Sequence, residues 1–140
     1  MMFAALAAFA AAQERTPLAD LSTLRWQNRL LIVHEPASVD ALLALFASNA
    51  PAIVERSVIW FIVSGDRVHS NYPAELAGDL ADIIRRSLDT KENSALLIGL
   101  DGGIKMRSEG FDLQRFFSAI DAMPMRIWER RSREVLPAQP

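Results

Sequence analysis

One short segment brings together side chains that are suited to catalysis or ligand binding. His34, Glu35 and Ser38 follow the apolar residues 30–33, and Ser38 precedes a stretch with apolar side chains at helical spacing. The free N–H groups and the positive dipole end at the start of a helix stabilise anions. As a nucleophile, a serine needs a positioned base, and His34 is close in sequence. The alternative is that Ser38 only caps the helix and that His34 is a hydrogen-bonded histidine at the end of a strand.

Arg107 belongs to a second group of polar residues, which the order of elements brings back toward this segment. Residues 104–107 alternate apolar and basic side chains, as in a half-exposed edge strand, and they follow a tight turn at 101–103. If the strand before that turn begins beside His34, the strand after it returns there with Arg107. A cation, a hydroxyl and a helix N-terminus at one corner would form a small-anion pocket. The alternative is an exposed edge strand whose basic residues discourage pairing with other sheets.

The candidate anion- or ligand-binding residues are therefore His34, Glu35, Ser38 and Arg107, and no residue is assigned a catalytic role. No metal site is predicted, because the only two histidines, His34 and His69, do not have the spacing of metal ligands on one helix. No cofactor is predicted. The chain has no cysteine, which excludes thiol catalysis, disulfides and thiolate-ligated metals.

Length and composition limit the remaining function classes. The chain has 140 residues, enough for one domain, and 51% of them are hydrophobic, enough for a proper core. A net charge of −2 argues against nucleic-acid binding through bulk charge. No apolar stretch approaches the roughly 20 residues of a transmembrane span, so none is predicted.

The first residues predict export. Residues 1–12 carry no charge, and Ala10-Ala11-Ala12 offers the small side chains that a signal peptidase recognises. The basic residue that usually precedes the apolar part of a signal peptide is missing. An Ala-rich N-terminal helix is the alternative. If the segment is a signal peptide, the mature protein begins near Gln13 and is periplasmic or secreted.

The hydrophobic pattern predicts alternating strands and helices. Apolar runs at 30–33, 58–63 and 95–100 are typical of strands buried on both faces, and 104–107 adds an edge strand. Helices are predicted from Ser38 to Asn49, from Pro73 to Leu88 and from Asp112 to the proline at 124. The basic residues 126–133 around Trp128 fit contact with anionic lipid or a polyanion, or a solvated helix end that complements the dipole.

This order predicts an α/β domain with the thioredoxin-like fold, βαβαββα, in which helices flank a mixed four-stranded sheet. The crossovers make the first two strands parallel, and the tight turn makes the last two antiparallel. The predicted divisions are a signal peptide at 1–12, a lead at 13–23, the domain at 24–134 and a disordered tail at 135–140. Redox members of this fold carry cysteines at the start of the first helix and a proline before the third strand. Here residues 91–94 contain no proline.

Two segments resemble a known family. Residues 97–108 (LIGLDGGIKMRS) and 116–126 (FFSAIDAMPMR) are similar to domain-of-unknown-function family 4174, which is related to the DUDES domain of vertebrate secreted matrix proteins. The resemblance covers roughly residues 24–133. It implies a thioredoxin- or peroxiredoxin-like fold, export and no established activity. The family usually has lysine where this chain has Leu100, so a role for that cation does not carry over.

Two function hypotheses follow. The first is an exported, non-redox binding or interaction module whose partner is an extracytoplasmic protein or a small anion. The second is an enzyme that uses non-thiol chemistry at the corner formed by His34, Glu35, Ser38 and Arg107. An enzyme needs titratable groups that face one another in a cleft, so the position of His34 discriminates between the two hypotheses.

Overall fold

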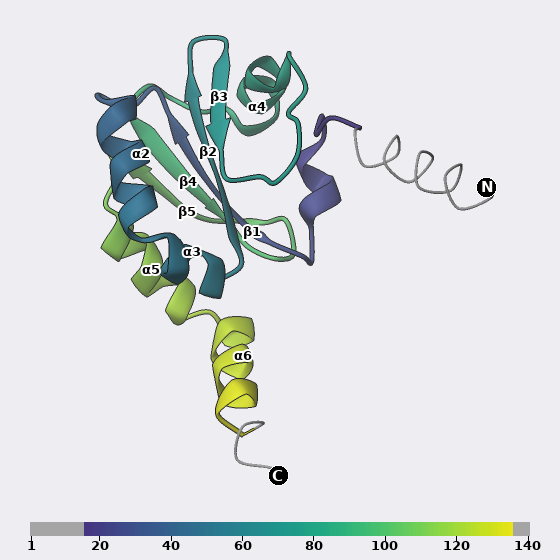
Figure 1. The fold of residues 1–140 in the computed structure, drawn as a ribbon, viewed down its shortest axis with the longest axis vertical. Coiled ribbons are helices and arrows are strands. Elements are labelled where there is room, and N and C mark those ends of the chain that lie inside the picture. The colour runs from purple at the N-terminus through teal and green to yellow at the C-terminus, as the bar shows by residue number, and fades with distance from the viewer. Residues whose placement is uncertain (1–15, 136–140) are drawn as a thin grey trace, which may run out of the picture.

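The computed structural model describes residues 16–135, which form a five-stranded mixed sheet with helices on both faces (Figure 1). The strands lie in the order β3-β2-β1-β4-β5. Their bounds are β1 Arg29–His34, β2 Val58–Ser64, β3 Arg67–Ser70, β4 Ser94–Ile98 and β5 Ile104–Glu109. The helices are η1 Leu21–Leu24, α2 Val39–Ser48, α3 Ala50–Glu55, α4 Leu80–Leu88, α5 Leu113–Asp121 and α6 Pro124–Val135.

Strand β1 lies at the centre of the sheet and is buried along its whole length. It pairs in parallel with β2, which puts Arg29 opposite Val58 and His34 opposite Val63. Its other neighbour, β4, is antiparallel, and there His34 lies opposite Ser94. The predicted parallel pair, the antiparallel β4–β5 pair and the mixed thioredoxin-like sheet are therefore confirmed.

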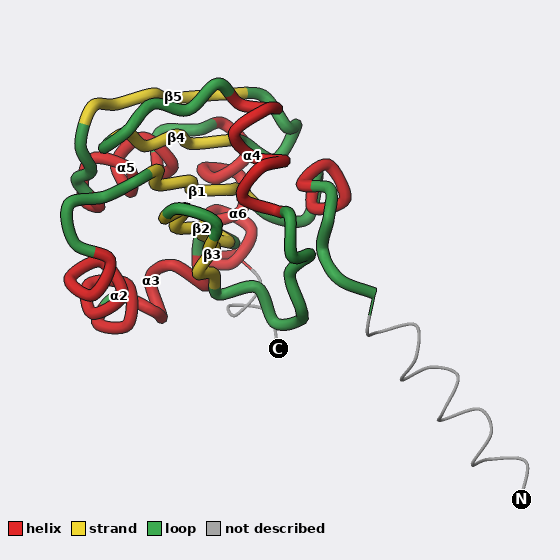
Figure 2. The backbone as a smooth tube through the Cα atoms, turned by 90° about the horizontal axis from the view of Figure 1, so that it is seen from above, coloured by secondary structure: helices red, strands yellow, loops and turns green. Residues whose placement is uncertain are grey.

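The two faces of the sheet bury two separate hydrophobic cores, because successive strand residues point to opposite faces. Leu31 and Val33 pack in the core under α2, α3 and α5. Leu30 and Ile32 pack in the other core, which is covered by α4 and η1. Figure 2 shows α2 and α5 on one side of the sheet and α4 on the other. The helix caps agree with the sequence: Ser38 Oγ accepts from the N–H of Ala41, and Asp112 caps α5.

Two expectations about the elements were wrong, and one helix was not predicted. The sheet has five strands, not four, because the turn after β2 leads into β3, whose short length and mixed burial gave no clear pattern. Helix α4 begins at Leu80 rather than near Pro73, because the backbone around residues 75–77 is hydrogen-bonded to Leu18 instead of to a helical turn. The Asn49-Ala50-Pro51 segment ends α2 but also starts α3, since proline is tolerated in a first helical turn.

The C-terminal basic segment is a helix that is fixed to the domain by ion pairs. Helix α6 extends beyond one end of the sheet (Figure 1). Arg126, predicted to lie in a solvated or polyanion-binding tail, is 1% exposed. Its Nη2 lies 3.0 Å from Glu55 Oε1, and its Nε lies 3.5 Å from Asp121 Oδ1. Asp121 also accepts from Arg56, with Nη2–Oδ2 at 2.9 Å. The expectation of a solvated tail was therefore wrong for Arg126.

The predicted signal peptide at 1–12 and all of the predicted disordered tail except Val135 lie outside the described residues. Val135 is instead the last residue of α6. None of the helices within residues 16–135 is long and apolar enough to cross a bilayer.

The Asp121 network predicts how stability depends on acid. Burial alone would raise the pKa of Asp121, but hydrogen bonds and charge from Arg56, and then from Arg126, lower it below the usual 3.8. A lowered folded-state pKa stabilises the fold above about pH 4, and this contribution is lost as the pH falls through the folded value. We expect Asp121→Asn to reduce the free energy of unfolding at pH 6 and to have a smaller effect at pH 3, measured by urea denaturation.

The matched control is Asp66→Asn in the exposed β2–β3 turn, which removes the same charge outside this network. An equal loss for Asp121→Asn at both pH values would contradict the role assigned to the ionised carboxylate.

Candidate functional site

His34 lies at the buried end of β1, and both of its ring nitrogens have partners. Its side chain is almost fully buried, at 6% exposure of the residue. Nδ1 lies 2.9 Å from the carbonyl oxygen of Lys91, and Nε2 lies 3.3 Å from Arg85 Nε. Because a guanidinium can only donate, Nε2 accepts and Nδ1 carries the proton that it donates to Lys91. The imidazole therefore has no free lone pair with which to accept a proton from a substrate.

Glu35 is fixed in the same way. Its Oε1 accepts from the backbone N–H of Gly65 at 2.7 Å and from Arg85 Nη2 at 3.1 Å. Arg85 also donates to the carbonyl oxygen of Gly65. Its guanidinium thus connects three elements: α4, the end of β1 and the β2–β3 turn. We call His34, Glu35, Arg85 and the backbone of Gly65 and Lys91 the polar joint.

Ser38 lies on the other side of this corner. It caps α2, and its Oγ accepts from the N–H of Ala41 at 3.1 Å. It lines a shallow cavity of about 290 Å³, together with residues of the β1–α2 connection, of α2, and with Asn93 and Phe111. Neither His34 nor Glu35 lines that cavity. The structure therefore gives Ser38 no hydrogen bond to a base among the described residues.

Arg107 returns to this end of the sheet but faces a different cavity. Strand β5 pairs Arg107 with Leu96 and Glu109 with Ser94, which itself lies opposite His34 on β1. The cavity beside Arg107 measures about 490 Å³ and is lined mainly by polar residues, among them Lys91, Asn93 and Ser94. The predicted return of the fourth strand is confirmed. The four candidate residues do not converge: His34 and Glu35 meet through Arg85, while Ser38 and Arg107 line separate cavities.

Sequence analysis missed Arg85 and Lys91. Arg85 lies on the polar side of the helical pattern, where a charged side chain is typical of solvent exposure. Lys91 acts on His34 through its backbone carbonyl, which no side-chain pattern reveals. Within residues 16–135, no group of three histidine, aspartate or glutamate side chains is placed to hold a metal ion.

Comparison with known proteins gives one family and structural neighbours with the same fold. A family model described as "Domain of unknown function (DUF4174)" matches residues 20–129. A reduced 2-Cys peroxiredoxin from Plasmodium vivax is structurally similar, with a TM-score of 0.54, 14% identity, and coverage of 73% of this chain and 68% of that chain. The mitochondrial 2-Cys peroxiredoxin of Plasmodium falciparum gives a TM-score of 0.53, 13% identity, and coverage of 74% and 79%. At these identities the likeness shows the fold alone. Curated protein sequences give no significant match.

The polar joint predicts a stability effect at Arg85. We expect Arg85→Gln to lower the free energy of unfolding by about 1–3 kcal/mol, because buried His34 loses its donor and Glu35 loses its ion pair. Chemical denaturation followed by circular dichroism measures the loss. Arg86→Gln, at the next, exposed position of α4, is the matched control. Equal stability of the two variants would show that the joint contributes nothing.

Proposed function

This chain belongs to the family described as DUF4174, a domain of unknown function, and on that premise we propose that it is an exported binding module that performs no catalysis. It has a thioredoxin-like fold and no cysteine, so thiol–disulfide and peroxidatic chemistry by cysteine are excluded. The N-terminal residues 1–12, with their signal-peptide pattern, support export.

The polar joint is the observation that carries the non-catalytic part of this proposal. A catalytic base needs a free lone pair within reach of the proton that it removes. His34 uses both ring nitrogens within the protein, and Glu35 is held by Arg85 and Gly65. Groups that satisfy one another in this way stabilise the meeting point of α4, β1 and the β2–β3 turn. The proposal would be contradicted if the unmodified chain catalysed a transfer or hydrolysis reaction and the His34→Gln variant, although folded, had lost that activity.

The cavity beside Arg107 is the site at which we propose that a small anionic group binds. Arg107 is exposed on β5, and the cation of Lys91 lines the same cavity. The carboxylates of Asp89, Glu92 and Glu109 also line it. These carboxylates oppose highly charged anions, so a small anion, such as inorganic phosphate or a single carboxylate, fits better than a polyanion.

The test of this site is anion binding by an arginine variant. We expect Arg107→Ala to weaken the binding of inorganic phosphate by about fivefold, the size typical of an exposed charge pair. The binding is followed by NMR titration of backbone amides. Arg115→Ala on α5 removes the same charge from an exposed position that does not line the cavity, and it should bind as the unmodified chain does. Unchanged phosphate binding by Arg107→Ala would remove this site from the proposal.

Export is tested separately by fractionating the native host and determining the intact mass and N-terminal sequence of the protein. We expect a chain that begins near Gln13 in the periplasmic or secreted fraction. An uncleaved chain in the cytoplasm would contradict export without affecting the binding proposal.

A further inference from the structure

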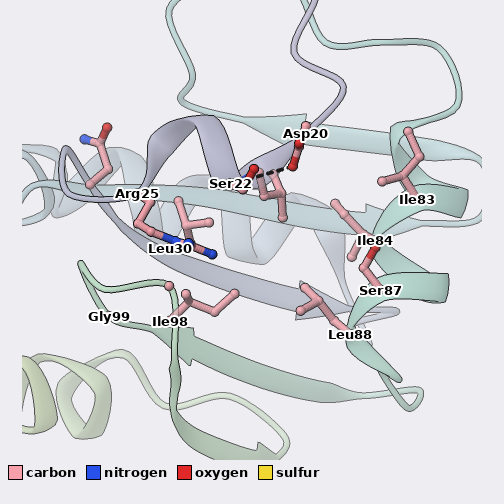
Figure 3. Close-up of a pocket in the computed structure, with 13 residues that line it drawn as sticks. Asp20, Ser22, Arg25, Leu30, Ile83, Ile84, Ser87, Leu88, Ile98 and Gly99 are labelled. Atoms are coloured by element: carbon pink, nitrogen blue, oxygen red, sulfur yellow. Dashed lines mark hydrogen bonds between the residues drawn. The ribbon is translucent and has the colours of Figure 1, made fainter.

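A third cavity lies at the opposite end of β1 from the polar joint. It measures about 250 Å³ and opens between η1, α4 and the β4–β5 turn. Its apolar side chains come from η1, from the two central strands and from α4, and Figure 3 labels those of the strands and of α4. They are Leu21, Leu30, Ile83, Ile84, Leu88 and Ile98. Polar groups of Asp20, Ser22, Arg25, Asn28 and Ser87 also line it.

Arg25 provides a cation for this cavity. It follows η1 directly, and Figure 3 shows its guanidinium directed inward, toward Leu30 and Ile98. Among residues 16–135 its guanidinium has no hydrogen-bond partner, and its electrostatic partner is Asp20. Arg25 is exposed to solvent, so its donors bind water in the free protein and are available to a ligand.

The absence of a side chain at Gly102 leaves the space that the guanidinium of Arg25 occupies. A Cβ atom at residue 102 would lie 2.5 Å from Arg25 Nε, which is too close for real contact. Gly102 also has a φ angle of +83°, as the tight turn requires. The turn therefore allows the planar guanidinium to lie against its backbone, beside the opening of the cavity.

We propose that this cavity binds a small amphipathic carboxylate, with the carboxylate on Arg25 and an aliphatic chain among the apolar residues of β1, β4 and α4. Two parallel N–H···O bonds from guanidinium match the geometry of a carboxylate. A cavity of about 250 Å³ has room for roughly eight water-sized groups. An unbranched chain of about that many atoms, as in octanoate, fits the space.

Asp20 favours a singly charged head group over a phosphate ester. Its carboxylate caps η1 by accepting from the N–H of Ser22 at 2.9 Å, and that bond holds the pKa of Asp20 below its usual value. Asp20 is therefore ionised at neutral pH and repels a dianion at the same opening more strongly than a monoanion. This site is separate from the Arg107 cavity, with which it shares no lining residue.

Titration calorimetry of the full chain with hexanoate, octanoate and 1-octanol tests the proposal. Octanoate should bind more tightly than hexanoate by about fourfold for each added methylene. Neutral 1-octanol should bind the same cavity about tenfold more weakly than octanoate does, because it has no charge to pair with Arg25. Equal affinity for hexanoate and octanoate, or no saturable binding of octanoate, would overturn the proposal.

Three variants locate the ligand. Arg25→Met keeps an unbranched apolar stem but removes the charged end, so octanoate should lose about tenfold in affinity while octanol is unaffected. Ser87→Phe, at an exposed lining position of α4, should fill the cavity and weaken both. Arg86→Gln, which does not line the cavity, should bind as the unmodified chain does. Wild-type octanoate affinity in Arg25→Met or Ser87→Phe would overturn the proposal.

Arg107→Ala keeps this test distinct from the proposed function. It should bind octanoate normally even where it has lost phosphate binding. Loss of octanoate binding in Arg107→Ala would place the ligand in the other cavity and overturn this proposal, while a failure to bind octanoate leaves the phosphate result standing.

Discussion

The complete burial of β1 is the constraint on which the rest of the structure depends. The strand carries apolar side chains in its middle, but it begins with Arg29 and ends with His34, and both are buried. A buried polar group costs free energy unless it is hydrogen-bonded, and a buried charge costs more unless it is paired. Each end of the central strand therefore requires partners from other parts of the chain.

The partners of these two residues determine where the outer elements sit. Arg29 donates to the carbonyl oxygen of Arg56 at 2.9 Å and pairs with Glu129 of α6 at 3.3 Å. His34 binds Arg85 of α4 and the backbone of Lys91. Helix α6 and helix α4 are thus both connected to β1 through polar contacts between residues far apart in sequence. The apolar cores supply most of the stabilisation, and these pairs select one arrangement of the elements.

Sequence reasoning predicted the features that depend on local pattern. Continuous apolar runs gave β1, β2 and β4, and alternation at 104–107 gave β5. Ser38 and Asp112 gave the starts of α2 and α5. It failed where a tertiary contact decides the structure: the Leu18 backbone takes the hydrogen bonds that would have extended α4 toward Pro73, and acidic partners bury Arg126. For the site, topology returned β5 to the correct end of the sheet. It could not show that His34 accepts a hydrogen bond from Arg85 of α4, whereas Ser38 caps α2 on the other face of the sheet.

The polar joint occupies the corner of the fold at which redox members carry their cysteines, and it gives that corner a structural role. The sheet and its two cores do not depend on a reactive group at the end of β1, so that corner is free to take on a structural role. There Arg85 replaces solvent as the partner of His34 and Glu35. The cavity that contains Arg25 and the cavity that contains Arg107 both lie near the C-terminal end of α4, where Leu88 lines the first and Asp89 lines the second. Arg85 connects α4 to the end of β1 one helical turn before these residues, so the contact that holds His34 and Glu35 also positions the end of α4 near both cavities.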